Sequence, residues 1–338
     1  MIHLRNFAPN LIRGKSNFFT SIKLFTRNAS SNVKQKMSDA SSDESIGYDG
    51  DALTKKTLFR KKFKFYKKRS PPPDLSEVID IRSGSNVTDL VSSPLSGVDT
   101  SFPPDLPAKL GFRPFSEWKI SSFKSRPGLF ILSDVIHPSS HLKWIERALL
   151  EYPEPPNTTN VHLHMPEARD LFPQYAKKLH WATLGLHYNW TTKEYPFEGY
   201  PLPRELCETA SVVSQALRLG KMQADATIVN YYFPKSTLSP HIDRSERFIE
   251  RPLISLSFGQ SAVYLTGGTD LDDAVEALLL HSGDVLVMYG DQRLVYHAVA
   301  RIEKTRTFDG DGTVAQNIVD YANSNRVNIT IRQVDKTV

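Results

Sequence analysis

A histidine and an aspartate two residues apart, His241 and Asp243, have the types and spacing needed to bind a metal ion. They follow an apolar run over 225–233 and a turn, so we predict that they lie on a short strand over 238–243. Alternate residues of a strand point to the same side, which places His241 and Asp243 together and turns Ile242 away. One imidazole and one carboxylate on the same side of a strand can bind one ion.

His297 is the candidate third ligand. It comes after the apolar run 285–288, in a predicted strand over 294–299. Two histidines and one carboxylate on one side of a metal leave the opposite positions open, which is the arrangement of non-haem Fe(II) oxygenases. The His-x-Asp spacing has little specificity by itself, because lone histidines on strands more often have structural roles. We single out no catalytic residue beyond this predicted metal site.

The C-terminal segment 326–334 adds two arginines to this chemistry. Polar and apolar residues alternate along it, which predicts a half-buried strand. Its polar face carries Arg326, Asn328, Thr330 and Arg332. Inward-facing arginines are costly without anions. A dicarboxylic acid bound to the metal would satisfy both, since a guanidinium group matches a carboxylate at two points. The alternative is an edge strand with both arginines in solvent.

These motifs together resemble a known family. HID at 241–243, His297 and RVNITIR at 326–332 are similar to the HxD…H…RxNxTxR signature of the AlkB family of Fe(II)/2-oxoglutarate-dependent dioxygenases, and NYY at 230–232 resembles its NxY motif. Longer stretches resemble the AlkB homologue-1 subfamily: LFRKKFKFYKKR (58–69), VIDI (78–81), KLHWATLGLHYNW (178–190), NYYFPKSTLSPHIDRSE (230–246), PLISLSFGQSAVYLTGG (252–268), HSGDVLVMYGDQRLVYHAVARI (281–302) and RVNITIRQV (326–334). The resemblance covers residues 58–334.

The resemblance implies Fe(II), 2-oxoglutarate and O2 as the reaction partners of the site. The implied metal ligands are His241, Asp243 and His297. The implied co-substrate-binding residues are Asn230, Tyr231, Tyr232, Arg326, Asn328 and Arg332. Within that set, Arg326 assisted by Tyr232 would bind the far carboxylate of 2-oxoglutarate, while Arg332 and Asn230 would lie near its metal-bound end.

The resemblance further implies oxidation of methyl groups on nucleic-acid bases, with tRNA favoured and DNA N6-methyladenine as a second substrate. A methyl group on nitrogen would leave as formaldehyde, whereas one on carbon would remain as an oxidised group, and the sequence leaves both outcomes open. Two alternatives also stay open. One is a protein (histone) demethylase or hydroxylase on the same scaffold, and the other is a non-catalytic nucleic-acid-binding barrel.

The candidate substrate-binding residues are Phe172, Leu186, His187, Tyr188, Ser245 and Glu246. A methylated base must leave its stack and lie between flat groups. By family position, His187 and Tyr188 are the leading stacking candidates, with a place in the ordinary core as the alternative. Bacterial members of the family carry a base-contacting aspartate two residues after the metal aspartate. Ser245 occupies that position here, which argues against a preference for alkylated DNA damage.

The composition is that of a globular chain with a sizeable core. The 338 residues are 40% hydrophobic with a net charge of +5, and Cys207 is the single cysteine, so no internal disulfide forms. No apolar run approaches the roughly 20 residues needed to span a membrane. Helical patterns over 141–152 and 204–219 precede strands predicted at 225–233, 238–243, 252–259, 261–266, 274–280, 284–289, 294–299 and 326–334. We therefore predict an α+β fold, a double-stranded β-helix (jelly roll) with flanking N-terminal helices, over residues 111–338.

Residues 55–69 contain nine basic and four aromatic residues. Phe59, Phe63 and Tyr66 lie at i, i+4 and i+7, which predicts a helix with one aromatic face. Its basic face is consistent with phosphate contacts, with a nuclear-import signal or with simple docking. We assign 55–110 to this basic helix and an extended arm, and we predict a surface loop over 303–325. Nucleic acid is the expected partner; no obligate protein partner is inferred, and the oligomeric state is open.

The N-terminal 36 residues have the composition of a mitochondrial transit segment. They are basic and serine-rich and contain no Asp or Glu, and charges interrupt every apolar run that a secretory signal would need. A disordered basic tail is the alternative. Residues 37–54 predict a disordered acidic linker. We expect a mitochondrial location, or a nuclear or cytoplasmic one if translation starts at Met37.

Overall fold

The protein is built on two antiparallel sheets. The computed structural model describes residues 56–84, 88–95, 98 and 101–336. The larger sheet has nine strands in the order β1-β2-β3-β11-β8-β13-β6-β5-β4. Their bounds are β1 Leu90–Pro94, β2 Lys119–Phe123, β3 Arg126–Leu132, β4 Thr158–Thr159, β5 Trp181–Gly185, β6 Ala226–Tyr232, β8 Leu253–Gly259, β11 Val285–Met288 and β13 Arg326–Arg332. The segments 1–36 and 37–54, for which we predict a transit segment and a linker, lie outside the described residues.

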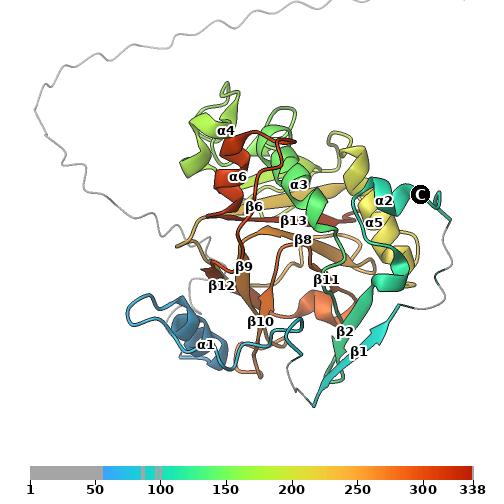
Figure 1. Cartoon of the computed structure of the whole chain (residues 1–338), viewed down its shortest axis with the longest axis vertical. Helices are drawn as coiled ribbons and strands as arrows, with labels where there is room; N and C mark the ends of the chain where they lie inside the picture. The colour runs from blue at the N-terminus through green and yellow to red at the C-terminus, as the bar shows by residue number, and fades with distance from the viewer. Residues whose placement is uncertain (1–55, 85–87, 96–97, 99–100, 337–338) are drawn as a thin grey trace, which may run out of the picture. The chain divides into compact units, whose positions relative to one another are not determined.

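The smaller sheet has four strands in the order β10-β9-β12-β7. Their bounds are β7 Leu238–His241, β9 Ser261–Thr266, β10 Glu276–Leu280 and β12 His297–Glu303. From β6 to β13 the chain passes repeatedly between the two sheets, and side chains from both sheets form one apolar cluster between them, which includes Ile131, Leu253, Tyr264 and Leu280. This arrangement confirms the predicted jelly-roll fold (Figure 1).

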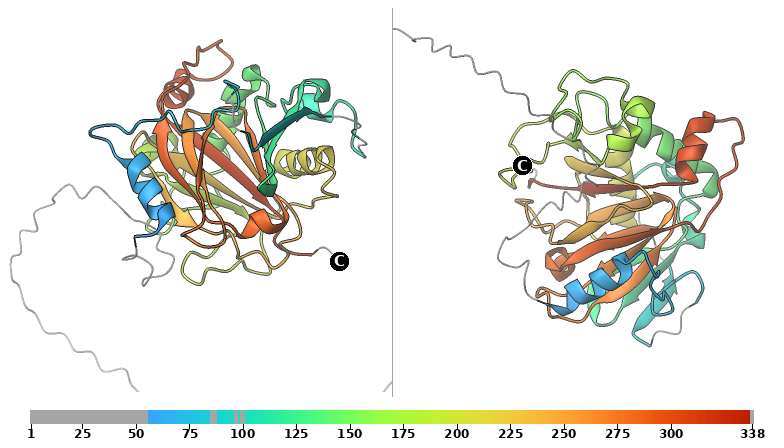
Figure 2. Two further views of the ribbon diagram at one scale, coloured as in Figure 1. Left: turned by 90° about the horizontal axis from the view of Figure 1, so that it is seen from below. Right: turned by 90° about the vertical axis from the view of Figure 1, so that its left-hand side faces the viewer.

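The helices cover the outer faces of both sheets (Figure 2). Their bounds are α1 Leu58–Lys67, α2 Leu106–Lys109, α3 Pro138–Leu150, α4 Leu171–Gln174, α5 Arg204–Ala216 and α6 Gln316–Ala322, with short 3-10 turns η2 Phe115–Glu117, η3 Ala176–Lys178 and η4 Gly290–Leu294. Helices α3, α5 and α6 share an apolar core with the outer side chains of the larger sheet. Helix α1 covers the smaller sheet, where Phe59, Phe63 and Tyr66 pack on Val263 and Ala298. The predicted aromatic face is therefore confirmed.

Strand β13 shows why the site lies between the sheets. Val327, Ile329 and Ile331 belong to the helix-covered core, so the alternate residues Arg326, Asn328, Thr330 and Arg332 face the other side. All four polar residues are buried. The alternative of an edge strand with solvated arginines is wrong, because β13 pairs with β6 and β8 on its two sides.

Several element boundaries differ from the prediction. The segment 303–325 is not only a surface loop, because it contains α6, whose Ile318, Val319, Tyr321 and Ala322 are buried. The extended arm carries strand β1, paired with β2. Strands β1 to β4 are absent from the prediction, since none of their sequences shows a clear alternation of polar and apolar residues. Strand β7 ends at His241, so Asp243 follows the strand instead of lying on it.

Candidate metal and co-substrate site

His241, Asp243 and His297 converge on one point at the edge of the smaller sheet. His241 is the last residue of β7 and pairs in register with His297, the first residue of β12. Asp243 lies two residues beyond the strand. One ligand atom from each of the three side chains lies within 4.8 Å of the other two. The structure therefore brings the three predicted metal ligands together.

Backbone carbonyl groups fix the tautomer of both imidazole rings. The Nδ1 atom of His241 donates to the Ser239 carbonyl at 2.9 Å, and that of His297 donates to the Val295 carbonyl at 3.2 Å. The Nε2 atoms face Asp243, at 4.0 Å from Oδ1 for His241 and 3.7 Å from Oδ2 for His297. Both Nε2 lone pairs are thus turned toward the carboxylate, as a metal site with oriented ligands requires.

The protonation states of two of these groups suit metal binding. Burial, together with the charge of the neighbouring His297, lowers the pKa of His241 to about 4, so its ring is neutral at physiological pH. Burial alone would raise the pKa of Asp243. The positive charge of Arg332 nevertheless holds that pKa well below its usual range. A neutral imidazole and an ionised carboxylate are the ligand forms that a divalent ion needs.

Arg332 connects Asp243 to a buried network of charges. Its Nη2 donates to Asp243 Oδ2 at 2.9 Å, and its Nη1 donates to the Tyr195 hydroxyl at 3.1 Å. Its Nε lies 2.9 Å from Glu246 Oε1, and Arg293 Nη2 lies 3.0 Å from Glu246 Oε2. Two carboxylates and two guanidinium groups therefore lie together with balanced charge, which limits the cost of removing the buried Glu246, Arg293 and Arg332 from water.

Arg326 is buried without an anion of its own. It is 1% exposed, and no ion pair among the described residues includes it. Its Nη2 donates to Ser257 Oγ at 2.8 Å, while Nη1 makes longer contacts of 3.4 and 3.5 Å with the Leu280 and Gln260 carbonyls. Burial lowers the pKa of Arg326 to about 10, which still leaves it charged. Tyr232 lies opposite Arg326 in the β6–β13 pairing.

An open pocket adjoins the candidate metal ligands. It is lined by Tyr188, Trp190, Tyr195, Ile228, Asn230, Leu238, Ser239, His241, Asp243, Ser245, Glu246 and Arg332. Three aromatic rings form one wall, with centroids 4.8 Å apart for Tyr188 and Trp190 and 5.1 Å apart for Tyr188 and Tyr195. The Tyr188 hydroxyl lies 3.3 Å from Ser245 Oγ. The pocket can therefore accept a flat apolar group directly beside the metal ligands.

The predicted site residues divide into two groups in the structure. Asn230, Tyr188, Ser245, Glu246 and Arg332 line the pocket, together with His241 and Asp243. Leu186 packs behind the aromatic wall in the same apolar cluster as Tyr188 and Tyr195. Glu246 belongs to the pocket wall, but both of its oxygens face arginines.

Among the other predicted residues that do not line the pocket, four make contacts with the surrounding protein. Tyr231 faces the helix-covered side of β6 and donates to the Ala148 carbonyl, because neighbouring strand residues point to opposite sides. Asn328 donates to Ser255 Oγ and the Leu256 carbonyl. Phe172 is in the core, with its ring 5.8 Å from that of Tyr321. His187 contacts Thr183 and Tyr200 outside the pocket lining.

Tyr195 and Arg293 are functional candidates that the sequence prediction missed. Tyr195 lies in the segment between β5 and α5, and Arg293 lies in η4. Neither segment has a periodic pattern of polar and apolar residues. Nothing in the sequence therefore distinguishes Tyr195 or Arg293 from the other tyrosines and arginines of the chain. Trp190 belongs to the stretch 178–190 that resembles the subfamily, and it lines the pocket.

Known proteins resemble the chain over most of its length. A sequence profile described as the 2OG-Fe(II) oxygenase superfamily matches residues 128–332. The mouse (Mus musculus) protein named nucleic acid dioxygenase ALKBH1 is 35% identical over 281 residues, which cover 74% of this chain and 71% of that protein. The Schizosaccharomyces pombe protein named tRNA demethylase abh1 is 32% identical over 311 residues, covering 82% of this chain and 95% of that protein.

A plant relative is named for a DNA substrate. The Arabidopsis thaliana protein named DNA N(6)-methyladenine demethylase ALKBH1A is 27% identical over 356 residues, covering 86% of this chain and 99% of that protein. Members of the matching superfamily use Fe(II), 2-oxoglutarate and O2, and the His-Asp-His cluster and the buried, anion-free Arg326 fit that use. The chain belongs to the 2OG-Fe(II) oxygenase superfamily and, within it, to the AlkB homologue-1 dioxygenases.

Proposed function

We propose that this dioxygenase oxidatively demethylates, or oxidises methyl groups on, nucleic-acid bases, with tRNA as the favoured substrate and DNA N6-methyladenine as the second. The observation that carries the proposal is the aromatic pocket beside His241 and Asp243. A base that has left its stack is bound against flat rings, and the wall of Tyr188, Trp190 and Tyr195 supplies them. The names of the mouse, fission yeast and plant relatives support the same substrate class.

Each part of the site has a separate task in this proposal. Bound iron with 2-oxoglutarate and O2 supplies the oxidising power for attack on a methyl group. His241, Asp243 and His297 hold the metal through three ligand atoms. Arg326 binds the far carboxylate of the co-substrate, and Arg332 keeps Asp243 ionised and oriented. The aromatic wall excludes water and places the methyl group toward the metal.

Helix α1 is the proposed contact for the nucleic-acid backbone. It packs against β12 and β7, the two strands that carry His297 and His241 (Figure 1). Phe59, Phe63 and Tyr66 face the protein, whereas Phe65 and the lysines Lys61, Lys64 and Lys68 are exposed. Basic side chains beside the pocket can bind phosphates without reading the base sequence.

Reversing the charge of Lys61, Lys64 and Lys68 to glutamate is expected to weaken tRNA binding and to flatten its dependence on salt. Removing a lysine that binds one phosphate lowers the slope of log affinity against log salt by about 1. The affinity for 2-oxoglutarate is expected to stay the same, because no α1 side chain contacts Arg326 or Arg332. Fluorescence anisotropy with labelled tRNA across a salt series measures the tRNA affinity and its salt slope.

A matched control carries the same charge change at three exposed lysines outside α1. Lys119, Lys124 and Lys221 are exposed and lie outside α1. Their reversal to glutamate tests whether net charge alone explains the weaker binding. Equal weakening by both triple variants would contradict a specific role for α1.

The substrate class is tested by comparing three substrates in one assay. Succinate release is measured with tRNA, with DNA containing N6-methyladenine and with a methylated histone peptide. The proposal predicts the strongest stimulation by tRNA. The peptide belongs in the test because Tyr188, Trp190 and Tyr195 could also surround a methylated ammonium group. Stimulation by the peptide alone would replace the proposal with a protein demethylase.

We also propose that residues 1–36 direct the protein to mitochondria. The support is their basic, acid-free composition. Fused to a fluorescent reporter, residues 1–36 are expected to bring the reporter into mitochondria, and a reporter fused to residues 37–54 serves as the control. A diffuse or nuclear signal from the first fusion would show that the segment is a basic tail.

A further inference from the structure

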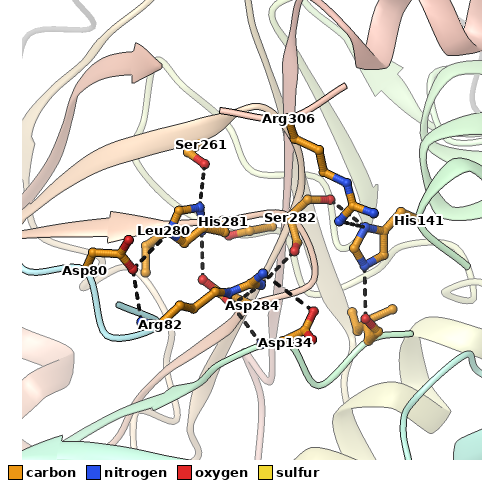
Figure 3. A network of polar contacts seen from close by, with 12 residues as sticks. Asp80, Arg82, Asp134, His141, Ser261, Leu280, His281, Ser282, Asp284 and Arg306 are labelled. Atoms are coloured by element: carbon orange, nitrogen blue, oxygen red, sulfur yellow. Dashed lines mark hydrogen bonds and ion pairs between the residues drawn. The ribbon is translucent and has the colours of Figure 1, made fainter. Parts of the chain in front are cut away.

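An N-terminal arm, residues 75–84, reaches the back of the proposed 2-oxoglutarate site. Its backbone runs beside β10, where Ile79 donates to the Ala277 carbonyl at 2.8 Å and accepts from Leu279 at 2.9 Å. Beyond this point Asp80 and Arg82 extend toward the turn 281–284, which connects β10 to β11 (Figure 3). The arm therefore meets that turn from a position about 200 residues earlier in the chain.

Arg82 neutralises a buried carboxylate in this turn. Its Nη2 donates to Asp284 Oδ1 at 2.5 Å and to the Ser282 carbonyl at 2.8 Å. Asp284 is 2% exposed, and it also accepts from the backbone amides of Asp134 and His281 at 2.9 and 2.7 Å. Among the described residues, Arg82 is the only cation in an ion pair with Asp284. Without Arg82, the turn would hold an unpaired buried charge.

The same turn frames the guanidinium group of Arg326. Leu280, directly before the turn, offers its carbonyl to Arg326 Nη1, and Ser257 Oγ accepts from Nη2. Ser257 in turn donates its amide to the Asp284 carbonyl at 3.0 Å and accepts from the Gly283 amide at 2.8 Å. Arg326 and Asp284 are thus held by one set of hydrogen bonds, with opposite charges.

The turn is also fixed from the opposite side, by α3. Ser282 Oγ lies 2.9 Å from His141 Nδ1, and His141 Nε2 donates to the Ile136 carbonyl at 3.0 Å. Gly283 has a φ of +88°, and a Cβ atom there would lie 2.6 Å from His141 Nε2, so only glycine fits. These contacts hold the turn in place on the side opposite to the arm.

We propose that Arg82 is a positioning residue for 2-oxoglutarate: by neutralising Asp284, it leaves the positive charge of Arg326 available to the far carboxylate of the co-substrate. The inference rests on the proposed role of Arg326. It assigns a part of the co-substrate site to an N-terminal arm that contributes no residue to the metal ligands or to the described pocket lining. The charge of Asp284 itself acts on Arg326, because it raises the pKa that burial lowers.

The test is a double-mutant cycle of Arg82 and Asp284 in the full chain loaded with Mn(II). The affinity for 2-oxoglutarate is measured by calorimetry. Arg82→Gln is expected to raise the dissociation constant about tenfold, equivalent to about 1.4 kcal/mol. Adding Asp284→Asn to that variant removes the unpaired charge and is expected to restore the affinity to within about twofold of the original. No change in the Arg82→Gln variant, or no rescue in the double variant, would overturn the proposal.

Two controls distinguish the effect of an unpaired charge at Asp284 from the effect of a loosened arm. Asp80→Asn weakens the arm's contact with His281 at 3.1 Å while leaving Asp284 paired, and it is expected to keep the original affinity. The ligand 2-oxopentanoate keeps the metal-binding end but lacks the far carboxylate, so its affinity should not respond to Arg82→Gln. Equal weakening of both ligands, or by Asp80→Asn, would mean that Arg82 is structural.

A third variant tests the premise separately. Arg326→Gln is expected to weaken 2-oxoglutarate binding more than Arg82→Gln does. Unchanged binding in Arg326→Gln would refute the role of Arg326 and this inference with it. That result would leave the nucleic-acid assignment standing, because the measurement contains no nucleic acid.

Discussion

Replacing His241, Asp243 or His297 with alanine is expected to abolish metal binding and succinate production. Each residue supplies one of three ligand atoms clustered within 4.8 Å, and two ligands bind a divalent ion far more weakly than three. The fold is expected to survive, because none of the three side chains belongs to the apolar clusters between or outside the sheets.

Metal affinity is measured by calorimetry with Mn(II), and folding is measured by thermal unfolding. His164→Ala is the matched control, since His164 is an exposed histidine outside the site. Full succinate production in any of the three ligand variants would contradict the assignment. Loss of activity together with loss of the folded state would leave His241→Gln as the variant to measure, because glutamine keeps more of the side-chain volume.

Arg326→Gln is expected to raise the KM for 2-oxoglutarate by about 100-fold or more, while the KM for nucleic acid changes little. Breaking one side of a buried charge pair costs about 3–5 kcal/mol, and every 1.4 kcal/mol is about tenfold in binding. Arg326→Lys keeps the charge but loses the two-point geometry, so an intermediate KM is expected. An unchanged KM in Arg326→Gln would show that another cation binds the far carboxylate.

For the protein without ligand, we expect Arg326→Gln to have no harmful effect on stability, in contrast to its effect on 2-oxoglutarate binding. Arg326 is buried and forms no ion pair with any residue in the described part of the chain, so replacing it with a neutral side chain removes a desolvated charge and should not lower thermal stability. In the original protein, 2-oxoglutarate with Mn(II) should raise the melting temperature, since a ligand that binds only the folded state stabilises it. That rise should be largely absent in Arg326→Gln.

The metal ligands and the arginine strand could be predicted because their signals are local. The close spacing of His241 and Asp243 keeps the two side chains near each other even though Asp243 lies beyond the end of β7, and the alternation along 326–332 places the two arginines on one side of β13. The aromatic face of α1 follows from helical periodicity for the same reason. Tyr231 shows the limit of motif reading, since strand alternation already requires it to point away from Asn230 and Tyr232.

The remaining site residues depend on long-range packing that no local pattern encodes. Arg293 reaches Glu246 from the 3-10 turn η4, and Tyr195 reaches Arg332 from a loop. Arg82 meets Asp284 across 202 positions of sequence. Helix α6 was missed because its seven residues are too few to show a helical period, and packing against α3 and β8 buries its apolar side chains.

The most direct test of the proposed function is nucleoside mass spectrometry of total tRNA after incubation with the protein, Fe(II), 2-oxoglutarate and O2. The account predicts that at least one methylated nucleoside decreases, or appears in an oxidised form, in step with succinate. Asp243→Ala in the same incubation should leave every nucleoside unchanged. Identical nucleoside profiles for the two proteins, with succinate released by the original protein on a methylated histone peptide, would contradict the assignment to nucleic acid.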